Sequence, residues 1–181
     1  MHKVNKASRI YLFPTDTEAT IFRELSPDAR VVVSGVGMVA TSATIMHLVR
    51  EGVVDAQSCV VLAGIAGAYG SDVAVGEVVE VTAERCSELP ERFQQSYATE
   101  PYTSLRCVRS NTVHGASSVA DDASVENMEG AALFALAEVV GFRAVEIRAI
   151  SNRVGEPFAL WCVKEAVEAL GRTLAALEDK M

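Results

Sequence analysis

Three glutamates, one arginine and one asparagine have the positions best suited to chemistry. Glu18 follows the first apolar run of the chain, while Glu126 and Glu129 precede a later apolar segment. Arg148 and Asn152 stand at the end of the last apolar run. A carboxylate can activate water or stabilise a cation, and guanidinium and amide groups can orient a polar substrate. The set is typical of an enzyme acting on a small polar molecule.

Each of these residues also has a structural interpretation. Thr15 and Glu18 fit a capping box at a helix start, and Glu126 and Glu129 could favour a helix N-terminus through its dipole. Arg148 could simply pair with Glu146 two residues away, because the two share a face of a strand. Asn152 could be a turn residue. Residue types alone leave both interpretations open.

Two glycine-rich segments accompany these side chains. Residues 35–37 (Gly-Val-Gly) and 64–67 (Gly-Ile-Ala-Gly) follow apolar runs and are expected to form turns that let backbone N–H groups approach a ligand. The first segment is not a dinucleotide fingerprint, because Ala40 stands where the third glycine belongs and no acidic residue follows a second strand at about 20 residues on. A Rossmann dehydrogenase is therefore set aside.

The elements that position these groups alternate along the chain. Apolar, β-branched runs predict strands, and stripes at helical spacing predict helices, so we expect a sheet covered by helices. The strands are predicted at 9–13, 29–34, 59–63, 77–82, 105–109 and 144–150. The helices are predicted at 17–25, 39–50, 125–140 and 157–177. Residues 85–103 are predicted to form a loop with one helical turn.

Composition narrows the class of protein. A length of 181 residues fits a single domain over 1–181, and a net charge of −8 argues against nucleic acid or anionic lipid as partners. The apolar run at 10–13 is too short for a signal peptide or membrane span, and four scattered cysteines fit reduced thiols, so we expect a cytoplasmic protein. We expect no metal site and no cofactor.

The order and spacing of four segments resemble a known family. Residues 34–40 (SGVGMVA), 63–67 (AGIAG), 126–132 (ENMEGAA) and 148–152 (RAISN) are similar to the nucleoside phosphorylase superfamily. The nearest branches are the methylthioadenosine/S-adenosylhomocysteine nucleosidases and, more closely, futalosine hydrolase. The resemblance runs from about residue 9 to residue 177. It implies a three-layer α/β/α fold with a central mixed sheet and hydrolysis of the N-glycosidic bond of a purine nucleoside.

The resemblance also implies roles for individual residues. Glu18 would deprotonate the attacking water with help from Arg148, and Glu129 would accept hydrogen bonds from the ribose hydroxyls. Asn152 would contact the base, completing a catalytic set of Glu18, Glu129, Arg148 and Asn152. Substrate-binding residues would be Gly35, Gly64, Ile65, Ala66, Gly67, Asn127, Met128 and Glu129.

Asn152 bears on the identity of the base. Adenine-releasing relatives have an aspartic acid there, which can protonate the purine N7, whereas an amide donates a hydrogen bond and suits a 6-oxopurine. This favours futalosine, an inosine-like nucleoside of menaquinone synthesis, and release of hypoxanthine. An amide that flips could also accept from a 6-amino group, so adenine release stays an alternative.

Phosphate dependence and catalysis itself are separate questions. The phosphorylases have an arginine before the second glycine segment, where this chain has residues 61–63 (Val-Leu-Ala), so we expect water as the nucleophile. A phosphate-dependent phosphorylase and a non-catalytic nucleoside-binding relative stay open alternatives.

Some features depart from the family. The chain is shorter between Glu84 and Gly115, so we expect a pocket more open on that side, and Glu156 stands alone where futalosine hydrolases have an Arg-Asp pair. Candidates for an aromatic platform under the base are Phe93, Tyr97, Tyr102 and His114. The resemblance also implies a homodimer, with apolar surface from the glycine turn and the region 39–50.

Overall fold

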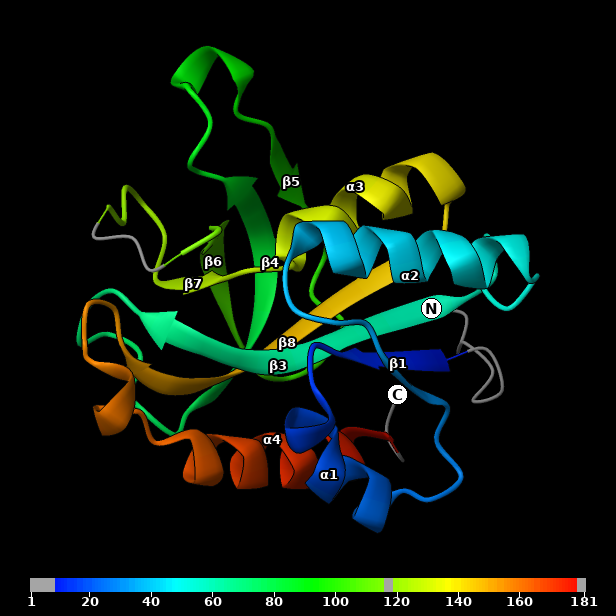
Figure 1. Cartoon of the computed structure of the whole chain (residues 1–181), viewed down its shortest axis with the longest axis horizontal. Helices are drawn as coiled ribbons and strands as arrows, with labels where there is room; N and C mark the ends of the chain where they lie inside the picture. The colour runs from blue at the N-terminus through cyan, green and yellow to red at the C-terminus, as the bar shows by residue number, and fades with distance from the viewer. Residues whose placement is uncertain (1–8, 116–118, 179–181) are drawn as a thin grey trace.

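A mixed β-sheet forms the centre of the molecule (Figure 1). The computed structural model describes residues 9–115 and 119–178. The strands are β1 (Arg9–Phe13), β2 (Val31–Val33), β3 (Cys59–Ala68), β4 (Val78–Cys86), β5 (Ser96–Ala98), β6 (Arg106–Thr112), β7 (Val125–Asn127) and β8 (Arg143–Arg153). The helices are α1 (Asp16–Leu25), α2 (Met38–Arg50), α3 (Gly130–Val140) and α4 (Val163–Glu178), with 3₁₀ turns η2 (Glu91–Phe93) and η3 (Phe158–Leu160).

Part of the sheet closes on itself. β2, β1, β3 and β8 run parallel, and β8 then pairs antiparallel with β4. β4 pairs with β6, β6 with β7, and β7 with β3, so that β3, β8, β4, β6 and β7 form a ring of hydrogen-bonded strands. β2 and β5 lie at the two ends of the sheet.

Helices cover both faces of the sheet, as Figure 1 shows: α2 and α3 lie on one face, and α1 and α4 on the other. Alternation along β8 explains the two faces, because Ala144 and Ile150 join the core under α2 and α3, while Val145, Ile147 and Ala149 join the core against α1 and α4. The predicted three-layer α/β/α class with a mixed sheet is confirmed.

The segment 64–67 differs from its prediction. Instead of a turn after the third strand, these residues continue β3, which pairs with β8 over its whole length. The glycines were expected to be turn residues, but both φ values stay outside the left-handed region. Their small size serves close packing against neighbouring side chains instead. The first glycine segment is a turn as predicted, with φ of +84° at Gly35 and +92° at Gly37.

Two predicted helices begin later in the structure. Residues 125–127 form the short strand β7 and α3 starts only at Gly130, while residues 158–160 form η3 and α4 starts at Val163. The segments before both helices contain apolar residues, so their spacing was compatible with a helix. For 125–127, pairing of β7 with β3 and β6 outweighs local preference.

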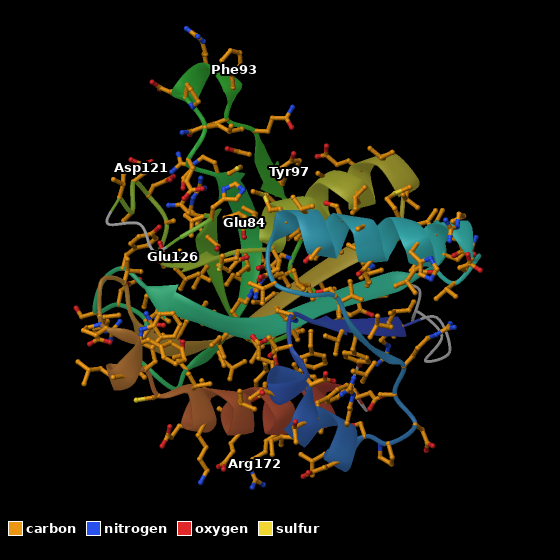
Figure 2. All side chains as sticks on the ribbon, in the orientation of Figure 1. Glu84, Phe93, Tyr97, Asp121, Glu126 and Arg172 are labelled. Carbon is orange, nitrogen blue, oxygen red and sulfur yellow. The ribbon has the colours of Figure 1, made fainter. Side chains whose placement is uncertain are left out.

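The predicted loop 85–103 contains more structure than expected. β4 extends to Cys86, η2 supplies the predicted helical turn, and β5 returns antiparallel to β4. This hairpin projects from the body of the molecule, and Phe93 lies at its tip (Figure 2). None of the helices in the described part of the chain combines the length and apolar character needed to cross a bilayer.

Candidate active site

A pocket of about 480 Å³, here called the main pocket, lies near the carboxyl ends of β1, β3 and β8. This is where ligands bind in open α/β sheets, because the loops and helix starts there can point at them. Glu18 reaches the pocket from α1, residues 65–67 from β3, and residues 126–129 from β7 and the start of α3. Ser151 and Asn152 complete the wall from β8.

Glu18 is a buried carboxylate aimed at the pocket by two hydrogen bonds. Thr15 caps α1 by accepting the Glu18 backbone N–H at 3.2 Å, and its hydroxyl donates to Glu18 Oε2 at 2.5 Å. The Ile65 backbone N–H donates to Glu18 Oε1 at 3.0 Å. Burial raises the pKa of Glu18, against these two hydrogen bonds and the nearby Arg148 charge, which lower it. A carboxylate with a raised pKa suits a general base.

Arg148 links the carboxylates of the site. Its side chain is fully buried, with Nη1 3.1 Å from Glu129 Oε2 and Nε 2.8 Å from Glu146 Oε1. Burial opposes the charge of Arg148, but Glu146 and Glu129 together raise its pKa. Arg148 does not line the main pocket; it lies behind Glu129 and holds that carboxylate in place.

Gly64 explains how Arg148 also comes near Glu18. The pairing of β3 with β8 places Gly64 directly beside Arg148. A Cβ atom at Gly64 would lie 2.6 Å from Arg148 Nη1 and 3.0 Å from Glu18 Oε1. Only glycine leaves room for the guanidinium at this point of β3.

Glu129 is positioned from three sides. Besides Arg148, the Gly37 backbone N–H donates to Glu129 Oε1 at 2.9 Å, which joins the first glycine turn to the site. Its backbone N–H donates to Asn127 Oδ1 at 2.8 Å. Asn127 Oδ1 also accepts from the Gly130 N–H and from Arg148 Nη2, so this one side chain fixes the start of α3 and the guanidinium.

The amide of Asn152 has a defined orientation. Its Nδ2 donates to the Arg153 carbonyl at 2.9 Å, and its Oδ1 accepts from the Ser151 hydroxyl at 2.7 Å. A flipped amide would set its oxygen against the Arg153 carbonyl oxygen, so the nitrogen must occupy this side. Nδ2 carries a second N–H and lies 3.2 Å from where a Gly67 Cβ would stand, at the pocket wall.

Not every predicted site residue lines the main pocket. Glu18, Glu129, Asn152, Asn127, Met128 and residues 65–67 do so. Arg148, Gly64 and Gly35 do not line it: Gly64 leaves room for Arg148, and a Cβ atom at Gly35 would lie 2.9 Å from the Ala40 Cβ. The structure thus gathers the predicted side chains in one place, and their roles stay predictions.

The aromatic residues of the pocket are not the ones singled out from the sequence. Phe158 and Trp161 line the pocket, with ring centroids 5.1 Å apart, whereas Phe93, Tyr97, Tyr102 and His114 do not line it. The spacing of Trp161 had placed it in a helix stripe. Pro157 next to Phe158 was the available signal, because proline disfavours a helical residue before it and often marks a new turn. From the shortened stretch only Val113 and Gly115 reach the pocket wall.

The pocket is acidic. Glu18, Glu126 and Glu129 line it, and among the described lining residues none is lysine, arginine or histidine. Glu126 is held at the wall by the Tyr69 hydroxyl, which donates to it at 2.8 Å. Such a wall stabilises a cation and repels a phosphate dianion.

Comparisons with known proteins agree with this architecture. No family model matches the chain. Over 56 residues the sequence is 46% identical to the futalosine hydrolase of Thermus thermophilus, a stretch covering 30% of this chain and only 25% of that protein.

Solved structures extend the likeness to nearly the whole chain. A 5′-methylthioadenosine/S-adenosylhomocysteine nucleosidase from Helicobacter pylori matches with a TM-score of 0.82 at 14% identity, over 98% of this chain and 100% of that one. The futalosine hydrolase of Helicobacter pylori gives 0.80 at 14% identity, over 97% and 99%. The 5′-methylthioadenosine nucleosidase of Arabidopsis thaliana gives 0.80 at 18%, over 96% and 95%. The chain has the nucleosidase fold.

Proposed function

We propose that this chain, built on the nucleosidase fold, hydrolyses the N-glycosidic bond of a purine nucleoside. The single observation that carries the proposal is the acidic pocket, in which Glu18 and Glu129 face the same space with Arg148 behind them. Cleavage of a ribosyl bond develops positive charge on the sugar, and fixed carboxylates favour that transition state over the neutral substrate.

Each polar group has a separate task in this reaction. Glu18, with its raised pKa, takes a proton from the attacking water, and Glu129 accepts hydrogen bonds from the ribose hydroxyls. Met128 lies along the sugar face, where a polarisable thioether suits a developing cation. Asn152 donates its second N–H to the leaving base.

Water is proposed as the nucleophile in place of phosphate. The residues before Gly64 are buried Val61, Leu62 and Ala63, which supply no charge. Arg148, the cation nearest the site, is already engaged by Glu129 and Glu146. A phosphate dianion would meet three carboxylates without a free guanidinium.

The proposed base is a 6-oxopurine such as hypoxanthine, released from futalosine or a similar nucleoside. The argument is the fixed orientation of Asn152, which presents an N–H to the pocket and keeps its oxygen on Ser151. An N–H donor complements N7 and O6 of a 6-oxopurine, whereas a 6-amino group would need an acceptor. A role in menaquinone synthesis follows if futalosine is the substrate.

We further propose a cytoplasmic, single-domain protein that acts as a homodimer. Val39, Ala43 and Met46 are exposed along one face of α2, and Val36 is exposed in the glycine turn just before it; Val39 is 81% exposed. Val36 also lines the main pocket, so a partner subunit covering this face would close one side of it.

The test is chromatographic detection of free base from futalosine, inosine, methylthioadenosine and adenosylhomocysteine, each with and without phosphate. Hypoxanthine from futalosine without phosphate is the expected result. Adenine release would contradict the proposed base, strict phosphate dependence would contradict hydrolysis, and binding without turnover would indicate a non-catalytic relative.

Two variants tie the activity to the pocket. Glu129→Gln removes the charge that stabilises the cationic sugar, and we expect turnover to fall by about 10²-fold or more. Glu24→Gln is the matched control, because Glu24 is an exposed glutamate on α1 away from the pocket. Wild-type turnover in Glu129→Gln would refute the mechanism.

A further inference from the structure

Two carboxyl groups meet beneath the start of α3, and the proposed reaction does not use them. Glu84 on β4 and Glu146 on β8 are 1% and 0% exposed. A Cβ atom at Gly130 would overlap Glu84 Oε2 and lie 2.6 Å from Glu146 Oε2. Both carboxyls therefore approach one point in the protein interior.

A register shift in β4 brings Glu84 to this point. Val79 and Val81 pair with Arg148 and Glu146 and share their face of the sheet, whereas Glu80 points to the opposite face. Simple alternation would place Glu84 with Glu80. The β-bulge between Val81 and Ala83 reverses the alternation and turns Glu84 toward α3.

The two carboxyls have different partners. Glu146 Oε1 accepts from Arg148 Nε at 2.8 Å, but its Oε2 is buried and receives no hydrogen bond from an N–H or hydroxyl group in the described part of the chain. Glu84 accepts from Asn127 Nδ2 at 2.8 Å, and no cation within residues 9–115 and 119–178 forms an ion pair with it. One proton between the carboxyls satisfies both groups.

Charge balance points to the same arrangement. Glu18, Glu84, Glu129 and Glu146 surround one buried guanidinium, Arg148. Full ionisation would leave a net charge of −3 in the interior, which is strongly unfavourable. Of the two carboxyls that meet beneath α3, Glu146 contacts the guanidinium directly and Glu84 does not, so Glu84 has less to gain from ionisation.

We propose that Glu84 is a neutral carboxylic acid that donates a hydrogen bond to Glu146 Oε2 and positions Asn127 and Arg148 for the reaction. The protonation state stands on geometry alone, while the positioning role rests on the proposed function. Glu84 holds Asn127 Nδ2, and Asn127 Oδ1 in turn holds Arg148 Nη2 and the backbone N–H of Glu129. An ionised Glu84 would repel Glu146 and disturb the positions of Asn127 and Arg148.

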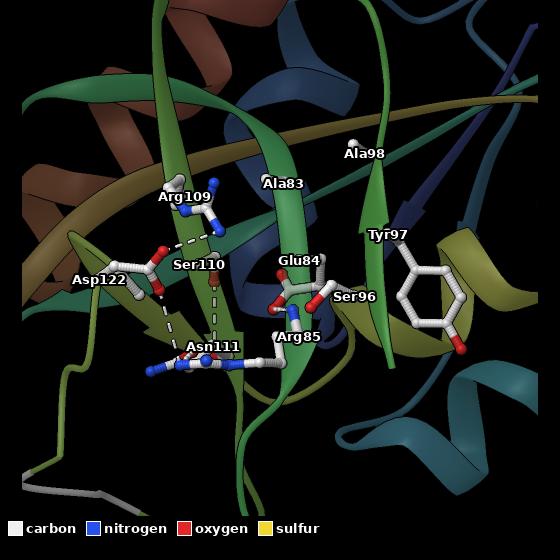
Figure 3. Close-up of a pocket in the computed structure, with 11 residues that line it drawn as sticks. Ala83, Glu84, Arg85, Ser96, Tyr97, Ala98, Arg109, Ser110, Asn111 and Asp122 are labelled. Atoms are coloured by element: carbon white, nitrogen blue, oxygen red, sulfur yellow. Dashed lines mark hydrogen bonds and ion pairs between the residues drawn. The ribbon is translucent and has the colours of Figure 1, made fainter. Parts of the chain in front are cut away.

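The surroundings of Glu84 favour the neutral form. Burial raises its pKa well above the usual range, the charge of Glu146 raises it further, and Asn127, Thr112 and Arg148 lower it. Tyr69 and Cys86 are the other titratable groups near Glu84. Glu84, Ser110 and Asn111 line a second cavity of about 210 Å³, and Figure 3 shows these side chains.

Infrared difference spectroscopy of the purified full chain tests the protonation directly. We expect wild type to show the carbonyl stretch of a protonated carboxylic acid at neutral pH, shifted in D₂O, and Glu84→Gln to lack it. Glu18→Gln identifies any band that Glu18 contributes. An unchanged acid band in Glu84→Gln, or none in wild type, would overturn the proposal.

Glu80→Gln is the matched control. Glu80 is also 1% exposed and lies on the same strand, but it accepts hydrogen bonds from the Tyr102 and Thr103 N–H groups and the Thr103 hydroxyl. It needs its carboxylate, so its replacement should leave the acid band intact. Loss of the band in Glu80→Gln would show that the proton belongs to Glu80, and the proposal for Glu84 would be wrong.

The positioning role is tested by rescue. Glutamine at 84 can donate to Glu146 and accept from Asn127, so Glu84→Gln should turn over substrate within a few-fold of wild type, while Glu84→Met should lose about tenfold or more. Glu84→Gln should also flatten the alkaline limb of the pH profile. Comparable loss in both variants, or failure of Glu84→Gln to fold, would overturn the role. An inactive wild type with the acid band present would refute only the proposed function.

Discussion

The hydrogen bonds of Asn152 make a prediction at the scale of one residue. In Asn152→Asp, the oxygen that replaces Nδ2 would face the Arg153 carbonyl and must carry a proton to keep that hydrogen bond. The carboxyl carries only this one proton, so protonation of a purine N7 uses it and gives up the hydrogen bond to the Arg153 carbonyl. Because a buried polar interaction with the base discriminates strongly, we expect the ratio of kcat/KM for adenine nucleosides over hypoxanthine nucleosides to rise by about tenfold or more. An unchanged ratio would show that Asn152 does not contact the base.

The hydrogen bond between Thr15 and Glu18 sets the pH response of the proposed base. The Thr15 hydroxyl lowers the pKa of Glu18, which burial raises, so Thr15→Val should raise that pKa further. Glu18 acts as a base only when ionised, and activity therefore rises with pH through its pKa. The acidic limb of kcat/KM should move to higher pH in Thr15→Val, measured with a hypoxanthine nucleoside.

Thr20→Val provides the control for the Thr15 variant. Thr20 lies on the same helix, and its hydroxyl donates to the Asp16 carbonyl at an exposed position away from Glu18. The acidic limb of the kcat/KM profile of Thr20→Val should match that of wild type. A limb that stays in place in Thr15→Val would contradict the assignment of Glu18 as the base.

At the scale of elements, the close approach of β3 to β8 depends on one missing side chain. In Gly64→Ala, the new methyl group would lie 2.6 Å from Arg148 Nη1, and the guanidinium would have to leave its place behind Glu129. A displacement of about 1 Å in a catalytic group can lower turnover by about 10²-fold, and we expect a loss of that order.

Gly115→Ala is the matched substitution. Gly115 also belongs to the main pocket, but, its chain neighbours aside, no atom of the described residues lies within 4 Å of the position of its Cβ. Steady-state kinetics should show little change for this variant. Equal losses of turnover in the two alanine variants would show that displacement of the Arg148 guanidinium is not the cause.

The sequence was a better guide to which residues meet at the main pocket than to the secondary structure that carries them. Strand β1 was predicted with its exact bounds and the first glycine turn was confirmed, because short-range patterns determine both. The structure of residues 64–67 and 125–127 depends on strands far away in the chain. Nothing local distinguishes Gly64 in a strand beside Arg148 from a glycine in a turn.

The same limit explains the residues that the sequence did not reveal. Glu84 reaches the site only through the β-bulge in β4, which has no sequence signature here. Phe158 and Trp161 reach the pocket because η3 interrupts what their spacing indicated as a helix. Capping of α1 by Thr15 and the pairing of Arg148 with Glu146 were visible in the sequence, because both are interactions between near neighbours.

At the scale of the whole molecule, the exposed face of α2 predicts the proposed homodimer. Val39→Glu combined with Met46→Glu places two charges on this face, and we expect light scattering to give half the wild-type mass. Because Val36, in the turn just before α2, lines the main pocket, KM should rise as well.

Leu25→Glu serves as the control for oligomerisation. Leu25 is 48% exposed on α1, which lies on the opposite side of the sheet in Figure 1. The mass of Leu25→Glu in solution should equal that of wild type. A wild-type mass that already corresponds to one chain would refute the homodimer.

The closed ring of strands has a consequence for aggregation. A strand inside the ring has hydrogen-bonded neighbours on both sides, and the strands at the two ends of the sheet, β2 and β5, are three residues each. Short edges offer few unpaired backbone groups to a strand of another copy, and natural proteins use them to resist amyloid-like growth. The proposed homodimer fits this design, because its contact is made by side chains on α2 and not by strand edges.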